Sequence, residues 1–107
     1  MYKIYCDGAS RSNPGEASIG ISIQNDEQEV DTIAKKIGVA TNNVAEYEGL
    51  RTALDYCDKN NLKDVQIYLD SLLVVQQVNG NYKVKSKNLK DLCNQCNDLI
   101  EKIDNVE

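Results

Sequence analysis

Residues 64–70 read DVQIYLD, a short run in which apolar side chains alternate with polar or aromatic ones. This period of two is typical of a half-buried strand. The first strand candidate, YKIYCD at 2–7, ends in the same way, with an aspartate two residues after a tyrosine. Although a single aspartate there is often only a turn or cap residue, the matched endings predict two parallel neighbouring strands. Asp7 and Asp70 would then end their strands together at the carboxyl edge of a sheet, where open α/β sheets bind ligands.

The residues between these two segments predict two more strands and a helix. SIGISIQ at 18–24 and EVDTIAKKIG at 29–38 have strand-like patterns and are joined by the polar turn NDEQ. The segment 41–61 begins with Thr and Asn cap candidates and continues with apolar residues at helical spacing. We therefore expect an antiparallel three-strand meander, a crossover helix, and a fourth strand parallel to the first.

Two helices account for the remaining residues. SLLVVQQVNG at 71–80 predicts a brief buried helix, and apolar residues recur every three or four positions from 87 to 104. No further strand pattern follows, so a fifth strand is expected to be missing. The fold class is thus α/β, a mixed sheet with flanking helices in one domain spanning 1–107. The exposed edge of the fourth strand predicts either a homo-oligomer that covers it or a longer parent chain.

Composition narrows the classes of function. The chain starts at a strand without a leader and has no apolar run of membrane-spanning length, so we expect a cytoplasmic protein that does not bind a membrane. Cys6 and Cys57 are interpreted as core residues, while Cys93 and Cys96 lie one helical turn apart, with a redox dithiol as the alternative. The chain contains no His that could complete a zinc site with them.

The net charge of −5 argues against a protein that binds nucleic acid over its whole surface. One stretch differs from this average, because YKVKSKNLK at 82–90 is basic and contains no acidic residue. A solvated loop and helix start would explain it as well as a patch that follows a phosphate backbone. The candidate phosphate contacts in this stretch are Lys83, Lys85 and Lys87.

Glu46 is an acidic residue on a helix face that is otherwise apolar. Helical spacing from Glu46 reaches Leu50 and Cys57, so these residues share the face turned toward the sheet. No Lys or Arg of the helix lies on that stripe, and burying an unpaired carboxylate is costly. We expect Asp7, Glu46 and Asp70 to converge and bound divalent cations to relieve their repulsion. Oxygen ligands suit Mg²⁺ or Mn²⁺.

Three segments now form a recognisable set: DGASRSNPG at 7–15, TNNVAEYEGL at 41–50, and DSLLVVQQVNGNYKVK at 70–85. In order and spacing they resemble the leading motifs of ribonuclease H type 1, particularly its prokaryotic branch related to archaeal enzymes. The resemblance implies a ribonuclease H-like fold and carboxylates that hold two metal ions about 4 Å apart. The carboxylates at the matching positions are Asp7, Glu46 and Asp70.

The resemblance also implies a substrate and further contacts. The expected reaction is endonucleolytic hydrolysis of the RNA strand of an RNA/DNA hybrid, leaving 5′-phosphate products. Short polar side chains suit the wide minor groove of such a hybrid, where 2′-hydroxyls are exposed, although capping and turn formation are alternative roles for them. The residues implied as nucleic-acid contacts in the first loop and before the crossover helix are Ser10, Asn13, Thr41, Asn42 and Asn43.

The chain also departs from the family pattern. The family's fourth carboxylate follows a fifth strand, and no matching motif is present before Glu107. Activity is therefore expected to be reduced. The alternative function is an inactive or accessory module with the same fold that binds hybrid or double-stranded RNA through its lysines.

Overall fold

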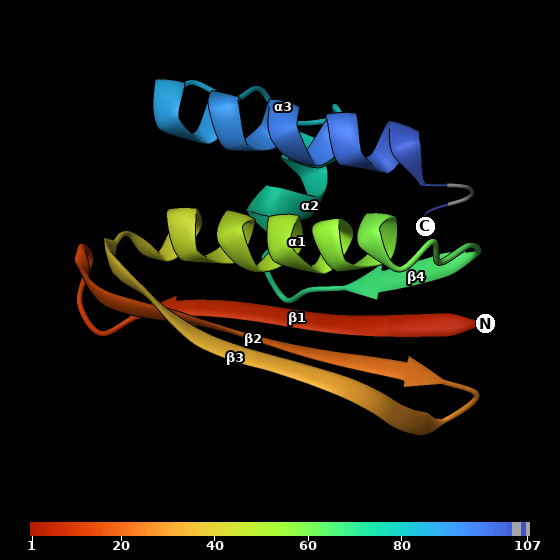
Figure 1. Cartoon of the computed structure of the whole chain (residues 1–107). Helices are drawn as coiled ribbons and strands as arrows, with labels where there is room; N and C mark the ends of the chain where they lie inside the picture. Colours follow the sequence, from red (N-terminus) through yellow and green to blue (C-terminus); the bar gives the residue numbers. More distant parts are fainter. Residues whose placement is uncertain (104–105, 107) are drawn as a thin grey trace.

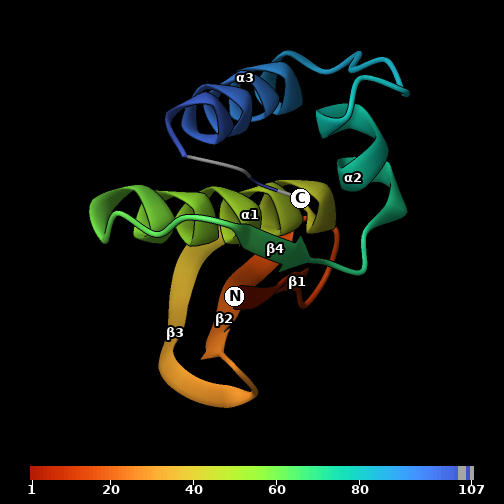
Figure 2. The ribbon, with the colours of Figure 1, turned by 90° about the vertical axis from the view of Figure 1, so that its right-hand side faces the viewer.

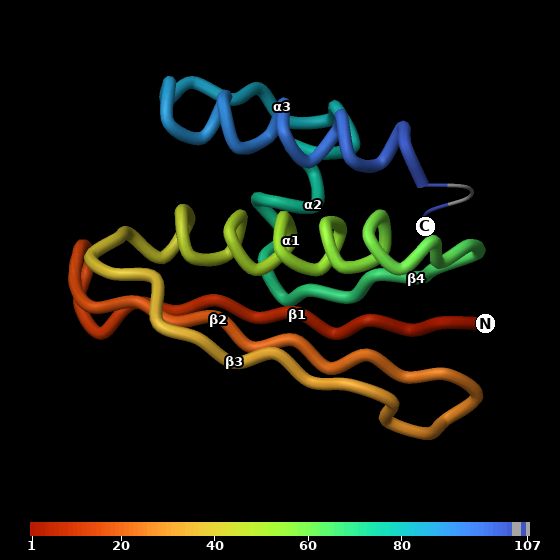
Figure 3. The backbone as a smooth tube through the Cα atoms, viewed as in Figure 1, coloured from red at the N-terminus to blue at the C-terminus, as the bar shows by residue number. Residues whose placement is uncertain are grey.

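The computed structural model describes residues 1–103 and 106. A four-stranded sheet forms one layer, in the order β3-β2-β1-β4. Strands β1 (Tyr2–Ser10), β2 (Gly15–Asn25) and β3 (Gln28–Ala40) form the antiparallel meander, and β4 (Val65–Tyr68) pairs with β1 in parallel (Figures 1 and 3). The expected α/β class and mixed strand arrangement are confirmed.

The strand limits correct one expectation. Asp7 does not end its strand, because β1 continues to Ser10 and Asp7 itself pairs with Gly20 of β2. Asp70 lies two residues beyond the end of β4. The last parallel pair is Tyr5 with Tyr68, so each aspartate still follows that pair by two residues. The antiparallel pairing with β2 prolongs β1 beyond the point where β4 leaves the sheet.

Three helices follow the meander and lie on one side of the sheet (Figure 2). Helix α1 (Asn42–Lys59) begins at Thr41, whose side chain accepts a hydrogen bond from the backbone N–H of Val44. The other helices are α2 (Leu72–Val78) and α3 (Lys87–Lys102). The expectation of a buried helix is wrong for most of α2, because only Val74 and Gln77 are buried and Leu72 is 62% exposed.

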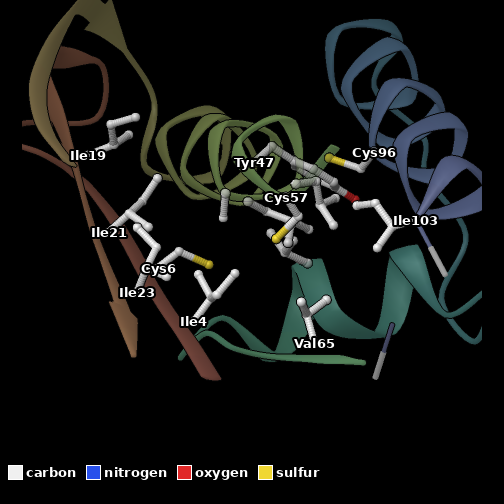
Figure 4. Close-up of a cluster of buried hydrophobic side chains, with 14 of the residues drawn as sticks. Ile4, Cys6, Ile19, Ile21, Ile23, Tyr47, Cys57, Val65, Cys96 and Ile103 are labelled. Carbon is white, nitrogen blue, oxygen red and sulfur yellow. The ribbon is translucent and has the colours of Figure 1, made fainter. Parts of the chain in front are cut away.

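The core lies between the sheet and the helices (Figure 4). Alternate residues of β1 and β2 point into it, and α1 and α3 supply the opposite side. All four cysteines are buried and free, as expected for reduced core thiols. Burial raises the pKa of Cys96 to about 12, and neighbouring Cys93 adds to the rise. Cys96 therefore stays protonated near neutral pH, which argues against the redox dithiol.

Two glycines let α1 approach β1 closely. A Cβ atom on Gly8 would lie 2.1 Å from the carbonyl oxygen of Ala45 and 2.8 Å from the backbone nitrogen of Glu46. From the helix side, a Cβ atom on Gly49 would lie 3.0 Å from the carbonyl oxygen of Asp7. The backbones of strand and helix are thus in contact beside Asp7 and Glu46.

The edge of the sheet at β4 has a pairing partner. Beside β4, Val106 forms an isolated parallel bridge with Val65, so a residue of the C-terminal segment does pair with the edge that was expected to be open. The hairpin turn that joins β2 to β3 contains Asp26 and Glu27, whose φ angles are positive, at 51° and 70°. In the part of the chain described, no helix is long and apolar enough to cross a membrane.

Candidate active site

Asp7 and Asp70 lie at the same level of two neighbouring parallel strands. The rings of Tyr5 and Tyr68, which precede them by two residues, are stacked with centroids 4.9 Å apart. Both aspartates are exposed and line a hollow of about 650 Å³ that also includes this tyrosine pair. The register of β1 and β4 therefore places the two carboxylates beside one open space.

Glu46 reaches the backbone of β1 beside Asp7 from α1. Its Oε1 atom accepts a hydrogen bond of 3.0 Å from the backbone N–H of Gly8, next to Asp7 in β1. Its Oε2 atom is buried and has no hydrogen-bond partner among the described residues. One oxygen is thus fixed to the sheet, while the other remains unsatisfied.

The environment of Glu46 favours its protonated form. Burial raises the pKa of Glu46 above its ordinary value of 4.5, the hydrogen bond from the Gly8 backbone opposes this rise, and the neighbouring carboxylate of Asp7 raises the pKa again. Asp70 contributes a further rise through its charge. The charges of Asp7 and Asp70 therefore both act on Glu46, and that of Asp7 acts more strongly.

A divalent cation fits this set of donors. A buried carboxylate oxygen without a partner, beside a second negative carboxylate, is the arrangement that a bound cation stabilises. Carboxylate oxygens suit Mg²⁺ or Mn²⁺. Within residues 1–103 and 106, no three Asp, Glu, Cys or His side chains already form a metal-binding cluster. Asp7 and Glu46 are therefore the candidate primary ligands, with Asp70 as a third.

Cys6 lies next to Asp7 but has a different role. Its side chain is buried and donates a long hydrogen bond of 3.6 Å to the carbonyl oxygen of Tyr68. Burial raises the pKa of Cys6 to about 12, and the charge of Glu46 adds to this effect. At neutral pH the thiol is protonated, which argues against a role as a nucleophile.

The two loops beyond the carboxylates meet through asparagine side chains. Asn42 accepts a hydrogen bond of 2.8 Å from the backbone N–H of Ser10, and Asn13 accepts one of 3.1 Å from the backbone N–H of Asn42. Thr41 caps α1 through Val44. The first loop and the start of α1 therefore form one polar surface. Asn43 is exposed on the same turn of the helix.

The basic residues form a separate surface, here named the lysine segment, which consists of residues 83–87. It comprises the end of the connection between α2 and α3 together with the first residue of α3, and its three lysine side chains are exposed: Lys83, Lys85 and Lys87. No acidic residue interrupts it. The structure brings the carboxylates together and, separately, the polar loops, with the lysines between two helices.

Sequence reasoning did not identify Gly49 as part of the site. A glycine inside a helix costs about 1 kcal/mol relative to alanine, so its presence in the middle of α1 is a signal of close packing. The contact with the Asp7 backbone explains it. Gly8 has the corresponding role in β1, because its neighbour is the helix that carries Glu46.

Comparison with known proteins agrees with this geometry. A family described as Reverse transcriptase-like matches residues 5–107. The chain is 42% identical over 91 residues to a bifunctional protein of Mycobacterium tuberculosis, covering 83% of this chain and 25% of that protein. It thus spans about a quarter of the length of this curated relative.

Solved structures are similar over nearly the whole chain. RNase H1 from Halobacterium salinarum superposes with a TM-score of 0.94 and 32% identity, covering 98% of this chain and 80% of that one. LC11-RNase H1, solved in complex with an RNA/DNA hybrid, gives a TM-score of 0.90 at 36% identity, covering 99% and 81%. The fold and the carboxylates therefore define a ribonuclease H-like α/β protein. Within that class, this chain belongs to the ribonuclease H type 1 family.

A stability measurement on Glu46→Gln tests the metal site without any substrate. Because its raised pKa makes folded Glu46 bind a proton more tightly than the unfolded chain, stability of the metal-free protein falls as the pH rises above 4.5. Glutamine keeps the acceptor for Gly8 and carries no charge. We expect the variant to unfold at a higher temperature than the wild type at pH 7, and this advantage to disappear below pH 4.5.

Adding Mg²⁺ or Mn²⁺ at pH 7 should raise the unfolding temperature of the wild type and leave that of Glu46→Gln nearly unchanged. Glu101→Gln is the matched control, since Glu101 is exposed on α3. Calorimetry with and without metal measures both effects. An equal metal-induced shift in wild type and Glu46→Gln would show that the cation binds elsewhere.

Proposed function

We propose that this chain is an endoribonuclease that hydrolyses the RNA strand of RNA/DNA hybrids with divalent metal ions. The observation that carries the proposal is the buried, unpartnered Oε2 atom of Glu46 beside Asp7. A purely structural carboxylate would be paired or absent from this face. The similarity to LC11-RNase H1, which was solved with an RNA/DNA hybrid, supports the substrate class.

The carboxylates would hold two metal ions and set their position. Asp7 presents its carboxylate from within a paired strand, and the bond from Gly8 fixes the orientation of Glu46. Asp70 contributes from the segment after β4. When bound, two such cations supply activation of the attacking water and stabilisation of the leaving 3′ oxygen. The RNA product would carry a 5′-phosphate.

The polar loops would distinguish the hybrid from DNA. Asn13 and Asn42 use their carbonyl oxygens inside the protein, which fixes the direction of each side chain and leaves the amide nitrogen as the group able to donate outward. Donors held in this way suit the 2′-hydroxyls and base edges of a wide minor groove. Ser10, Thr41 and Asn43 extend the same surface.

The lysine segment would hold a phosphate backbone. Its three lysine side chains are exposed on a chain whose net charge is −5, so this segment is a local basic surface on a protein that is acidic as a whole. Such contacts carry no sequence information. The proposed enzyme therefore recognises the shape and sugar chemistry of the hybrid.

Cleavage of defined substrates tests this proposal. RNA labelled at its 3′ end is supplied in an RNA/DNA hybrid, as single strand and in double-stranded RNA, each with Mg²⁺, Mn²⁺ or EDTA. We expect internal cuts in the hybrid alone, only with metal, and a phosphate at the new 5′ ends. Cleavage that persists in EDTA, or a ladder that begins at one end, would contradict the proposal.

The second candidate function is an inactive module that binds hybrid or double-stranded RNA. The absence of a ready three-residue metal cluster among residues 1–103 and 106, together with the exposed lysine segment, favours it. This candidate predicts tight, metal-independent binding of the hybrid and no cleavage with either metal.

A further inference from the structure

A buried pair of polar side chains joins α1 to α2. The hydroxyl of Tyr47 donates a 2.7 Å hydrogen bond to Oε1 of Gln77. Tyr47 is fully buried and Gln77 is 7% exposed. A tyrosine hydroxyl is protonated at neutral pH and is therefore a hydrogen-bond donor there. Tyr47 follows Glu46 directly in α1.

The amide nitrogen of the same glutamine reaches the lysine segment. Nε2 of Gln77 donates a 3.4 Å hydrogen bond to the backbone carbonyl oxygen of Lys83. The backbone carbonyl oxygen of Gln77 accepts a hydrogen bond of 3.1 Å from the backbone N–H of Gly80 and one of 3.7 Å from the Cys93 thiol. One residue of α2 therefore contacts α1, the segment after α2, and α3.

A buried amide in this place requires an explanation. Gln77 belongs to a helix whose sequence is otherwise largely apolar, LLVVQQV, and an apolar side chain of similar size would fill the space without a desolvation cost. The amide is tolerated because both of its ends are paired. The amide contributes a defined geometry, because its two hydrogen bonds fix the Lys83 backbone relative to Tyr47.

The chain between Gln77 and Lys83 turns sharply. Gly80 has a φ angle of +83°, and the backbone N–H groups of Asn81 and Tyr82 both donate to the carbonyl oxygen of Gln76. Lys83 is the next residue, and its side chain is exposed while its carbonyl oxygen faces Gln77. The contact thus lies where the chain leaves the turn and the lysine segment begins.

We infer that Gln77 is a positioning residue that fixes the lysine segment relative to the helix carrying Glu46, so that phosphate contacts and the metal site keep a constant spacing. This inference rests on the proposed function, because it takes the lysine segment as a nucleic-acid contact. Gln77 touches no substrate itself. It acts through the backbone of Lys83 and through Tyr47.

The test measures binding of RNA/DNA hybrid in EDTA, where no cleavage occurs. Gln77→Met approximately conserves the volume of the side chain and removes both hydrogen bonds that its amide makes. We expect a dissociation constant about fivefold higher, the effect of one hydrogen bond of ordinary strength, and a weaker dependence on salt. In cleavage assays KM should rise by a larger factor than kcat falls. Tyr47→Phe should shift binding in the same direction.

A background that lacks the three lysines of the lysine segment separates the positioning role of Gln77 from general destabilisation. In a Lys83→Ala, Lys85→Ala, Lys87→Ala chain, adding Gln77→Met should weaken binding no further, because the groups it positions are gone. Ile23→Val, a buried change on β2 remote from the lysine segment, controls for lost stability and should leave binding unchanged. Hydrogen exchange of the amides at 83–87 should accelerate in Gln77→Met and not in Ile23→Val.

The outcomes are distinguishable. Equal weakening in both backgrounds, or unchanged binding and exchange in Gln77→Met, would overturn the positioning role and leave the proposed function standing. A wild type that binds hybrid through its lysines without cutting it would overturn the proposed function alone. A wild type that does not bind hybrid would overturn both.

Discussion

Replacing Asp7 with asparagine is expected to lower the rate of hybrid cleavage by about a thousandfold, since a carboxylate ligand contributes several kcal/mol to metal-ion catalysis. The substitution keeps the size of the side chain and its place within paired β1. It removes the negative charge that acts together with Glu46. Rates with saturating hybrid in Mg²⁺ and in Mn²⁺ measure the effect.

The same variant should not be less stable than the wild type. Loss of the Asp7 charge relieves repulsion with Glu46 in the metal-free protein, so its unfolding temperature at pH 7 should be equal or higher. Asp98→Asn is the control for removal of an aspartate, because Asp98 is exposed on α3, and it should cleave at the wild-type rate. If Asp7→Asn retained more than about a tenth of the wild-type activity, Asp7 would not be a metal ligand.

The substitution Gly8→Ala is expected to destabilise the protein by about 3 kcal/mol or more, at the upper end of the cost of overpacking. Its Cβ atom would meet backbone atoms of Ala45 and Glu46, at distances from 2.1 to 2.8 Å. Backbone atoms cannot rotate away as a side chain can. Strand and helix must therefore separate, and the bond from Gly8 to Glu46 is lost with the contact.

Gly20→Ala is the matched control, because no atom lies within 4 Å of a Cβ atom at that position. It should leave stability unchanged or raise it by about 0.5 kcal/mol. Urea unfolding monitored by circular dichroism compares the two variants. Similar midpoints would mean that α1 can move from β1 at little cost, and that the glycine contact does not set the position of Glu46.

Much of this architecture could be predicted from sequence. Alternation identified the meander, and the repeated Tyr–x–Asp ending anticipated the register in which Tyr5 pairs with Tyr68. Helical spacing placed Glu46 toward the sheet, and the structure has it half-buried above Gly8. These features could be predicted because each depends on a local period or on pairing between neighbouring strands.

Other features depend on contacts between distant residues. The extent of β1 beyond Asp7 is set by its pairing with β2, which no pattern within 2–7 contains. Two adjacent glutamines at 76 and 77 look alike in sequence, yet only one is buried and reaches Tyr47. The choice depends on where the axis of α2 lies relative to α1, a tertiary property.

The distribution of charge also affects how a polyanion approaches this molecule. The turn between β2 and β3 carries Asp26 and Glu27 and adjoins the start of β1, since Asn25 pairs with Tyr2. Figure 1 shows this turn at the lower right, far from the beginning of α3 at the upper left, where the lysine segment ends. The lysine segment thus lies away from this acidic turn, so a nearby phosphate chain is oriented toward the lysines before any contact forms. Because the screening length shrinks to about 8 Å at physiological salt, this orientation acts at short range and favours fast association over indiscriminate binding.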